Sequence, residues 1–150
     1  AQVPRPRTSY KSKQSETEIW DLVNERYEEY VYESRKQFDA FLILKLNYDM
    51  TKIFKLDPDL EKQNINDKLF EYSIKQPNAF KQVVESEATV TINAAQLGLD
   101  FLSYASICIT PIKRSNNVVG FFMAFKHKKP TTTDVKLLED LSKETVQVAS

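Results

Sequence analysis

The feature that most constrains this chain is a pair of apolar segments near its C-terminal end, residues 105–112 and 118–127. Both are rich in β-branched and aromatic residues, and the polar stretch 113–117 separates them. Two such segments joined by a short polar turn are typical of an antiparallel β-hairpin that is buried in a sheet. We therefore expect this hairpin to form the middle of an antiparallel sheet on which the other elements pack.

The length of the turn predicts which side chains of the hairpin share a face. A two-residue turn, at 115–116 or 116–117, pairs odd positions with even ones, and directly paired residues lie on the same face of a sheet. One face then carries Ile107, Ile109, Phe122 and Ala124. The other face carries Ser106, Cys108, Thr110, Phe121, Met123 and Phe125. A bulge or an odd-length loop would exchange these partners, because a slip of one residue reverses every side chain.

An amphipathic helix is predicted over residues 15–38, where apolar residues recur at steps of three and four. Ser15 and Glu18 have the spacing of a capping box at its start. Its near-heptad stripe consists of Trp20, Val23, Tyr27 and Tyr30. Two interpretations are open: the stripe docks on the sheet, or it docks and also pairs with the same helix of a second copy in a homodimer.

The middle of the chain predicts two strands, a helical insertion and a third strand. Residues 40–47 and 52–56 have the composition of paired strands, and residues 88–93 of a short third strand. Helical spacing over residues 66–85 predicts two short helices with a break at a proline. Residues 94–102 are expected to form a loop or a short helix.

A closing helix is predicted after the hairpin, because three threonines and Asp134 supply an N-cap and an acidic first turn. Residues 1–14, rich in proline and basic side chains, are expected to be a flexible linker, and residues 15–150 a single domain. Because the chain begins with Ala1, we expect it to be part of a longer protein, with a flanking domain as its neighbour.

Composition excludes several classes of function. A net charge of zero argues against nucleic-acid binding, and no apolar run approaches the roughly 20 residues that a membrane span needs. One cysteine excludes an internal disulfide and a multi-cysteine zinc site, and favours a reducing, cytoplasmic location. Two glycines and one histidine are too few for phosphate-binding loops and most histidine-based sites, so we expect no metal, no cofactor and no enzyme activity.

The order of elements, with one local stretch, resembles the GAF family of sensory domains. The matching stretch is an apolar–proline strand end at 109–112, a turn, the Val-x-Gly-x-hydrophobic strand at 118–122, and an acid-capped helix from 133 to 141. The resemblance implies an α+β fold, a GAF/PAS-like antiparallel sheet. Long N- and C-terminal helices would cover one face of this sheet, and short helices and loops the other.

The resemblance also implies a ligand pocket on the sheet face opposite the terminal helices. Its floor would be Ser106, Cys108, Thr110, Phe121, Met123 and Phe125, and its roof Thr91, Asn93, Leu97 and Phe101. A pocket lined by apolar groups with a few polar ones suits a small molecule. Alternatively, the small side chains only make room for the large ones, and the site is filled core.

Several chemistries of the family do not fit this chain. Members that reduce free methionine sulfoxide use several cysteines, and members that bind bilins attach them through a cysteine in a loop, whereas Cys108 is expected in mid-strand as an inert thiol. The cyclic-GMP signature is absent from the sequence. Residues 126–129 form a basic cluster before a helix, which is either an anion site or a solvated strand end.

Two functions follow from this reasoning. The first is a regulatory sensory domain that binds a small molecule or nucleotide and relays the signal through its terminal helices. The second is a ligand-free module of the same fold for protein–protein interaction or dimerisation. A thermal-shift screen separates them, because a bound ligand stabilises the folded state.

Overall fold

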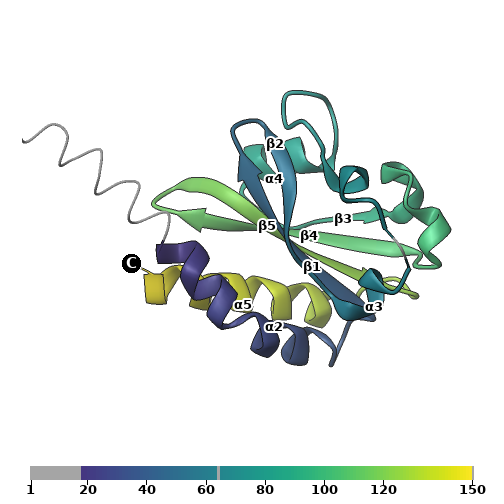
Figure 1. Cartoon of the computed structure of the whole chain (residues 1–150), viewed down its shortest axis with the longest axis horizontal. Helices are drawn as coiled ribbons and strands as arrows, with labels where there is room; N and C mark the ends of the chain where they lie inside the picture. The colour runs from purple at the N-terminus through teal and green to yellow at the C-terminus, as the bar shows by residue number, and fades with distance from the viewer. Residues whose placement is uncertain (1–17, 64, 150) are drawn as a thin grey trace, which may run out of the picture.

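The computed structural model describes residues 18–63 and 65–149. Its five strands form one antiparallel sheet in the order β2-β1-β5-β4-β3. They are β1 (Ala40–Asn47), β2 (Met50–Leu56), β3 (Val90–Asn93), β4 (Ser106–Arg114) and β5 (Asn117–Lys126). The predicted hairpin is therefore β4 and β5, and β5 is the central strand of the sheet (Figure 1).

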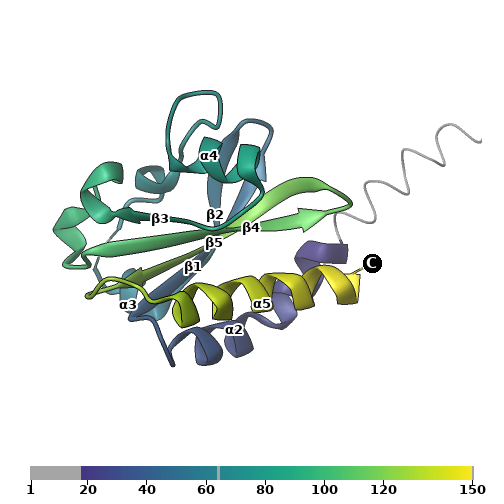
Figure 2. The ribbon, with the colours of Figure 1, turned by 180° about the vertical axis from the view of Figure 1, so that it is seen from behind.

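Helices from both ends of the described chain cover one face of the sheet. Residues 18–25, α2 (Tyr27–Ser34) and α5 (Thr132–Ala149) lie side by side there in both views (Figures 1 and 2). Their apolar stripes pack on the sheet in one core. The buried residues that these helices contribute are Ile19, Trp20, Val23, Tyr30, Leu138 and Leu141.

The prediction of one continuous helix over 15–38 is wrong. A turn at Arg26, with φ −95° and ψ 5°, separates residues 18–25 from α2. The helix ends at Ser34, whose hydroxyl donates to the carbonyl of Val31, a local bond that competes with continued helix. The predicted capping box at Ser15 lies outside the described residues.

Short helices cover the opposite face, as the predicted fold class requires. They are α3 (Pro58–Glu61), η1 (Asp67–Phe70), α4 (Ala79–Ser86), η2 (Ala94–Leu97) and η3 (Asp100–Leu102). A second core joins their buried side chains to this face of the sheet, among them Leu60, Phe70 and Phe80. In the described part of the chain, no helix has the length and apolar composition to cross a membrane.

The helical insertion differs from its prediction in the stretch before α4. Only a short 3-10 turn and α4 form, and residues 71–75 run along strand β2. Thr51 fixes this arrangement, because its amide donates to the Tyr72 carbonyl at 3.0 Å and its hydroxyl accepts from the Tyr72 amide at 2.8 Å. Backbone pairing with a strand edge thus overrides the helical periodicity.

Candidate functional site

The predicted faces of the hairpin are wrong, because the register changes between its turn and its middle. At the turn, Arg114 pairs with Asn117, as a two-residue turn requires. A β-bulge at Val119 then shifts the register, and Ile109 pairs with Met123. The shift exchanges the faces of one strand relative to the other. On β4, the side chains that lie on the face of the terminal helices, contrary to the prediction, are those of Ser106, Cys108 and Thr110.

The Phe–Met face, formed by Phe121, Met123 and Phe125, is turned away from the terminal helices as predicted. All three side chains are fully buried. The Phe80 ring lies 5.2 Å from that of Phe121, and the Tyr104 ring 5.4 Å from that of Phe125. Aromatic side chains therefore occupy the place where the resemblance implies a ligand, and a ligand there would have to displace them.

The predicted roof is also divided between two faces. Leu97 packs against the core that contains the Phe–Met face. Thr91 lies on the opposite face, where its hydroxyl is 3.5 Å from Cys108 Sγ. Asn93 is exposed and caps η2, and Phe101 is 58% exposed. The structure therefore does not bring the predicted ligand-binding residues together, and their binding role remains a prediction.

The helix stripe docks on the sheet of its own chain. Trp20, Val23 and Tyr30 are buried, and Tyr27 is half-buried beside them. These side chains already contact the sheet, so a homodimer seam through the same stripe would require them to leave it. The docking part of the prediction is confirmed, and the dimer remains a prediction.

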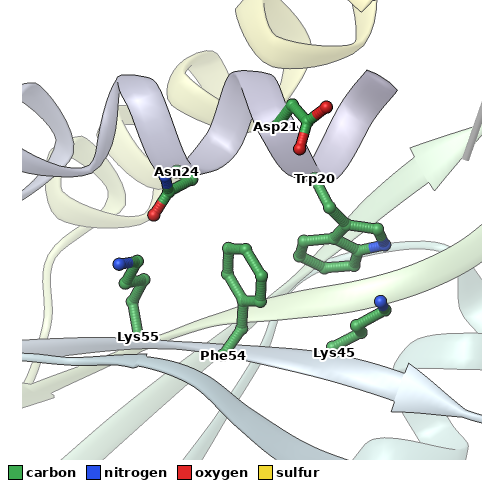
Figure 3. A pocket seen from close by; sticks show the side chains of 6 residues that line it. All are labelled: Trp20, Asp21, Asn24, Lys45, Phe54 and Lys55. Carbon is green, nitrogen blue, oxygen red and sulfur yellow. The ribbon is translucent and has the colours of Figure 1, made fainter. Parts of the chain in front are cut away.

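A hollow of about 380 Å³ lies where the first helical segment meets strands β1 and β2 (Figure 3). We call it the helix–sheet hollow. Trp20 and Phe54 form its aromatic part, with ring centroids 4.8 Å apart and an angle of 52° between the planes. The residues that line it are Trp20, Asp21, Asn24, Lys45, Phe54 and Lys55.

A β-bulge in β2 places two consecutive side chains of this strand at the hollow. The β1–β2 register shifts between Ile43 and Leu44, so that Phe54 is the extra residue and Lys55 pairs with Ile43. Side chains of a regular strand alternate between faces, but a bulge breaks this alternation. Phe54 and Lys55 therefore both line the hollow, on the face of the terminal helices.

The charges around the hollow are two lysines and one aspartate. Lys45 Nζ lies 5.5 Å from the centroid of the Trp20 ring, and Lys55 Nζ 5.7 Å from that of Tyr27. Among the described residues, neither lysine forms an ion pair. Both ammonium groups are half-exposed neighbours of aromatic rings, so their charge is available to a bound anion.

The indole N–H of Trp20 is a buried donor at this hollow. Trp20 is 4% exposed, and its Nε1 has no hydrogen-bond acceptor among the described residues. Leaving a buried donor unpaired costs about 1–3 kcal/mol. Figure 3 shows Nε1 at the end of the indole nearer Lys45. An unpaired, covered donor and two ammonium groups thus lie beside an aromatic surface, where the sequence periodicity had indicated core packing or a dimer seam for Trp20.

The lone cysteine is a core residue. Cys108 is fully buried under the terminal helices, and its burial raises the pKa of the thiol. A protonated, buried thiol is a poor nucleophile. In residues 18–63 and 65–149, no group of three or more His, Cys, Asp or Glu side chains is arranged to hold a metal ion.

The basic cluster at 126–129 begins with a structural lysine. Lys126 Nζ contacts the buried carboxylate of Asp134 at 2.5 Å. That carboxylate also accepts from the Thr131 amide, while the Thr131 hydroxyl accepts from the Asp134 amide, which completes a capping box at the start of α5. Asp134 therefore already occupies the helix N-terminus that an anion would need.

Comparison with known proteins gives a match only at the level of structure. No family model matches the chain, and no curated protein matches it. A type II free methionine-R-sulfoxide reductase from Thermoplasma acidophilum superposes with a TM-score of 0.66 at 12% identity, over 87% of this chain and 94% of that one.

Two GAF domains give similar values. The GAF domain of a two-component sensor histidine kinase from Bacillus halodurans has a TM-score of 0.61 at 17% identity, over 85% of this chain and 92% of that one. The second GAF domain of DevS from Mycobacterium smegmatis has a TM-score of 0.62 at 12% identity, over 90% and 92%. Together with the sheet order and the helix layers described above, these matches show that the chain has the GAF fold.

Proposed function

We propose that this chain is a regulatory domain that senses a small molecule and relays the binding through its terminal helices. The observation that carries the proposal is the direct contact between these helices on one sheet face. Tyr30 of α2 and Thr145 of α5 are joined by a hydrogen bond between their hydroxyl groups, and Arg26 Nη2 lies 3.5 Å from Glu144 Oε2. A displacement of one helix is therefore transmitted to the other.

The solved structures support a sensory role, because one of the matching GAF domains belongs to a two-component sensor histidine kinase. The reductase from Thermoplasma acidophilum has the same fold and is an enzyme. We propose that the present chain is not one, since its single cysteine is buried and therefore a poor nucleophile.

The experiment is a thermal-shift screen against nucleotides and small metabolites, followed by hydrogen exchange with any compound that raises the melting temperature. We expect slower exchange in residues 18–34 and in α5 when the ligand is bound. A ligand that changes exchange only in the short helices of the opposite face would contradict a relay through the terminal helices.

A ligand-free interaction module is the second candidate, and the packed Phe–Met face favours it. Tyr32 of α2 is the exposed aromatic residue of the terminal helices, with 70% of its surface accessible. If a second copy binds there, Tyr32→Glu abolishes the concentration dependence of the mass in sedimentation. Tyr48→Glu is the matched control, because Tyr48 is also exposed, at 93%, but lies at the β1–β2 turn.

A further inference from the structure

We infer that the helix–sheet hollow binds a small organic anion with a flat apolar body, such as an aromatic carboxylate. The inference rests on the proposed sensory function, and it names both the place and the chemical class of the ligand. It differs from the pocket that the GAF resemblance implies, because the hollow lies on the face of the terminal helices and the Phe–Met face lies opposite.

The aromatic part of the hollow favours a ligand with an apolar surface. The tilted rings of Trp20 and Phe54 present apolar surface from the helix and from the sheet. Aromatic rings interact favourably in tilted or offset arrangements at centroid distances of about 4.5–7 Å. A volume of about 380 Å³ is within the range of small-ligand sites. The two rings contact each other, so a planar group would lie against their outer surface, mainly that of half-buried Phe54, whereas an inorganic ion would leave this surface uncovered.

The charges around the hollow favour a ligand that carries a negatively charged group. Lys45 and Lys55 project toward the hollow from neighbouring strands, and only Asp21 opposes them (Figure 3). The Asn24 amide adds an uncharged donor, whereas the Trp20 indole N–H is covered in the free protein. A carboxylate can accept from several donors at once, and the single aspartate disfavours a second negative charge on the ligand. The combination selects a monoanion over an uncharged ring or a phosphate dianion.

The position of the hollow connects this ligand to the terminal helices. Trp20, Asp21 and Asn24 belong to the first helical segment, and the other lining residues belong to the sheet. A ligand that contacts both surfaces favours the arrangement in which they are correctly spaced. Occupancy of the hollow therefore biases the position of the segment that precedes α2.

Trp20 is the only tryptophan in the chain, so its fluorescence reports directly on this site. The test titrates the whole chain with sodium phenylacetate. Two controls separate the parts of the argument: 2-phenylethanol has the ring without the charge, and sodium acetate has the charge without the ring. We expect a saturable change in Trp20 emission with phenylacetate, at concentrations where neither control produces one.

Lys45→Gln should weaken phenylacetate binding about threefold to tenfold, the loss expected for one charge-assisted contact at a partly exposed site. Lys68→Gln makes the same change of charge on η1, on the other face of the sheet, and should leave the affinity unchanged. If Lys45→Gln lowers the melting temperature of the free protein, Lys55→Gln tests the same contact from strand β2.

Three results would overturn the inference: no saturable change of emission, equal binding of 2-phenylethanol, or equal affinity of the Lys45→Gln and Lys68→Gln proteins. A failure of the proposed function looks different. If the thermal-shift screen yields a ligand that slows exchange in the terminal helices but leaves Trp20 emission unaltered, the sensory function stands and the hollow is not its site.

Discussion

The hydroxyl of Tyr30 donates a hydrogen bond to the hydroxyl oxygen of Thr145, at the centre of the contact between α2 and α5. The direction follows from Thr145, whose own proton is donated to the Leu141 carbonyl at 2.9 Å. Both residues are fully buried, and burial raises the pKa of the Tyr30 hydroxyl. The bond therefore persists across the ordinary pH range and fixes the spacing of the two helices.

Thr145→Val should destabilise the protein by about 1–3 kcal/mol, because the buried Tyr30 hydroxyl loses its acceptor while the shape of the core is kept. Tyr30→Phe removes the donor and should have a smaller effect. Urea unfolding measures both changes. Tyr32→Phe is the control, since this exposed hydroxyl on the same helix should change the stability very little. A Thr145→Val protein as stable as the wild type would show that the bond does not hold the helices.

Gly120→Ala should destabilise the protein by about 2–3 kcal/mol through overpacking. A Cβ at this position would lie 2.5 Å from both the Leu44 carbonyl oxygen and Trp20 Cη2. Because the indole must move, the emission of Trp20 should also shift to longer wavelength. Gly98→Ala is the control: it has no atom within 4 Å, and its φ of +71° costs about 1 kcal/mol without affecting Trp20. Equal emission spectra of the two variants would contradict the packing described here.

The carboxylate of Asp134, which caps α5, predicts that the free energy of unfolding depends on pH. Burial alone would raise the pKa of Asp134, but the hydrogen bonds from Lys126 and Thr131 outweigh it and hold the pKa below its ordinary value of 3.8. A group whose pKa is lower in the folded state contributes stability above its unfolded pKa and loses it as the pH falls through the folded pKa. The contribution should therefore be complete at pH 6 and fade below about pH 4.

Asp134→Asn tests this dependence, and it should cost about 2 kcal/mol at pH 7 because the half-buried ammonium of Lys126 loses its partner. The free-energy difference from the wild type, measured by urea unfolding, should shrink as the pH approaches 3. A difference that is independent of pH between 7 and 3 would show that this carboxylate does not titrate with folding.

Cys108 should react with a thiol reagent such as DTNB only after unfolding. Its thiol is fully buried and burial raises its pKa, so both access and ionisation are unfavourable. At pH 8 the reaction should be about a thousandfold or more slower in buffer than in denaturing urea. Fast modification of the native protein would indicate an accessible nucleophile and would reopen the question of an enzyme.

The central hairpin, the antiparallel sheet and the layers of helices were predictable from the sequence, because these depend on long apolar runs and on helical periodicity. The cap of α5 was predictable too, since Asp134 follows three threonines at its start. The faces of the hairpin were not, because they depend on the bulge at Val119, which no turn residue indicates. The available sign of the bulge in the sequence was a glycine that follows two valines. The need for a glycine there comes from its contact with Trp20, which is distant in sequence.

The helix–sheet hollow could not be predicted from the pattern of residues. Lys45 and Lys55 have the spacing of solvated positions on strands, and their convergence depends on the bulge that also re-aims Phe54. The only local sign of this bulge in the sequence was the pair of consecutive apolar residues Ile53 and Phe54, which breaks strict alternation. The filled Phe–Met face likewise depends on rings from η1 and α4, whose distance from the sheet is set by tertiary packing.

The bulge at Val119 divides the hairpin into two parts with different registers, the tip and the strands below it. Insertion or loss of two residues at the tip would preserve the parity of the strands below and leave the aromatic layer in place. If Val119 instead paired with Ile112 as in a regular ladder, Cys108 would pair with Met123 and lie on its side of the sheet. Whether Val119 bulges or pairs therefore decides whether Cys108 and Met123 carry their sulfur atoms on opposite faces of the sheet or on the same one.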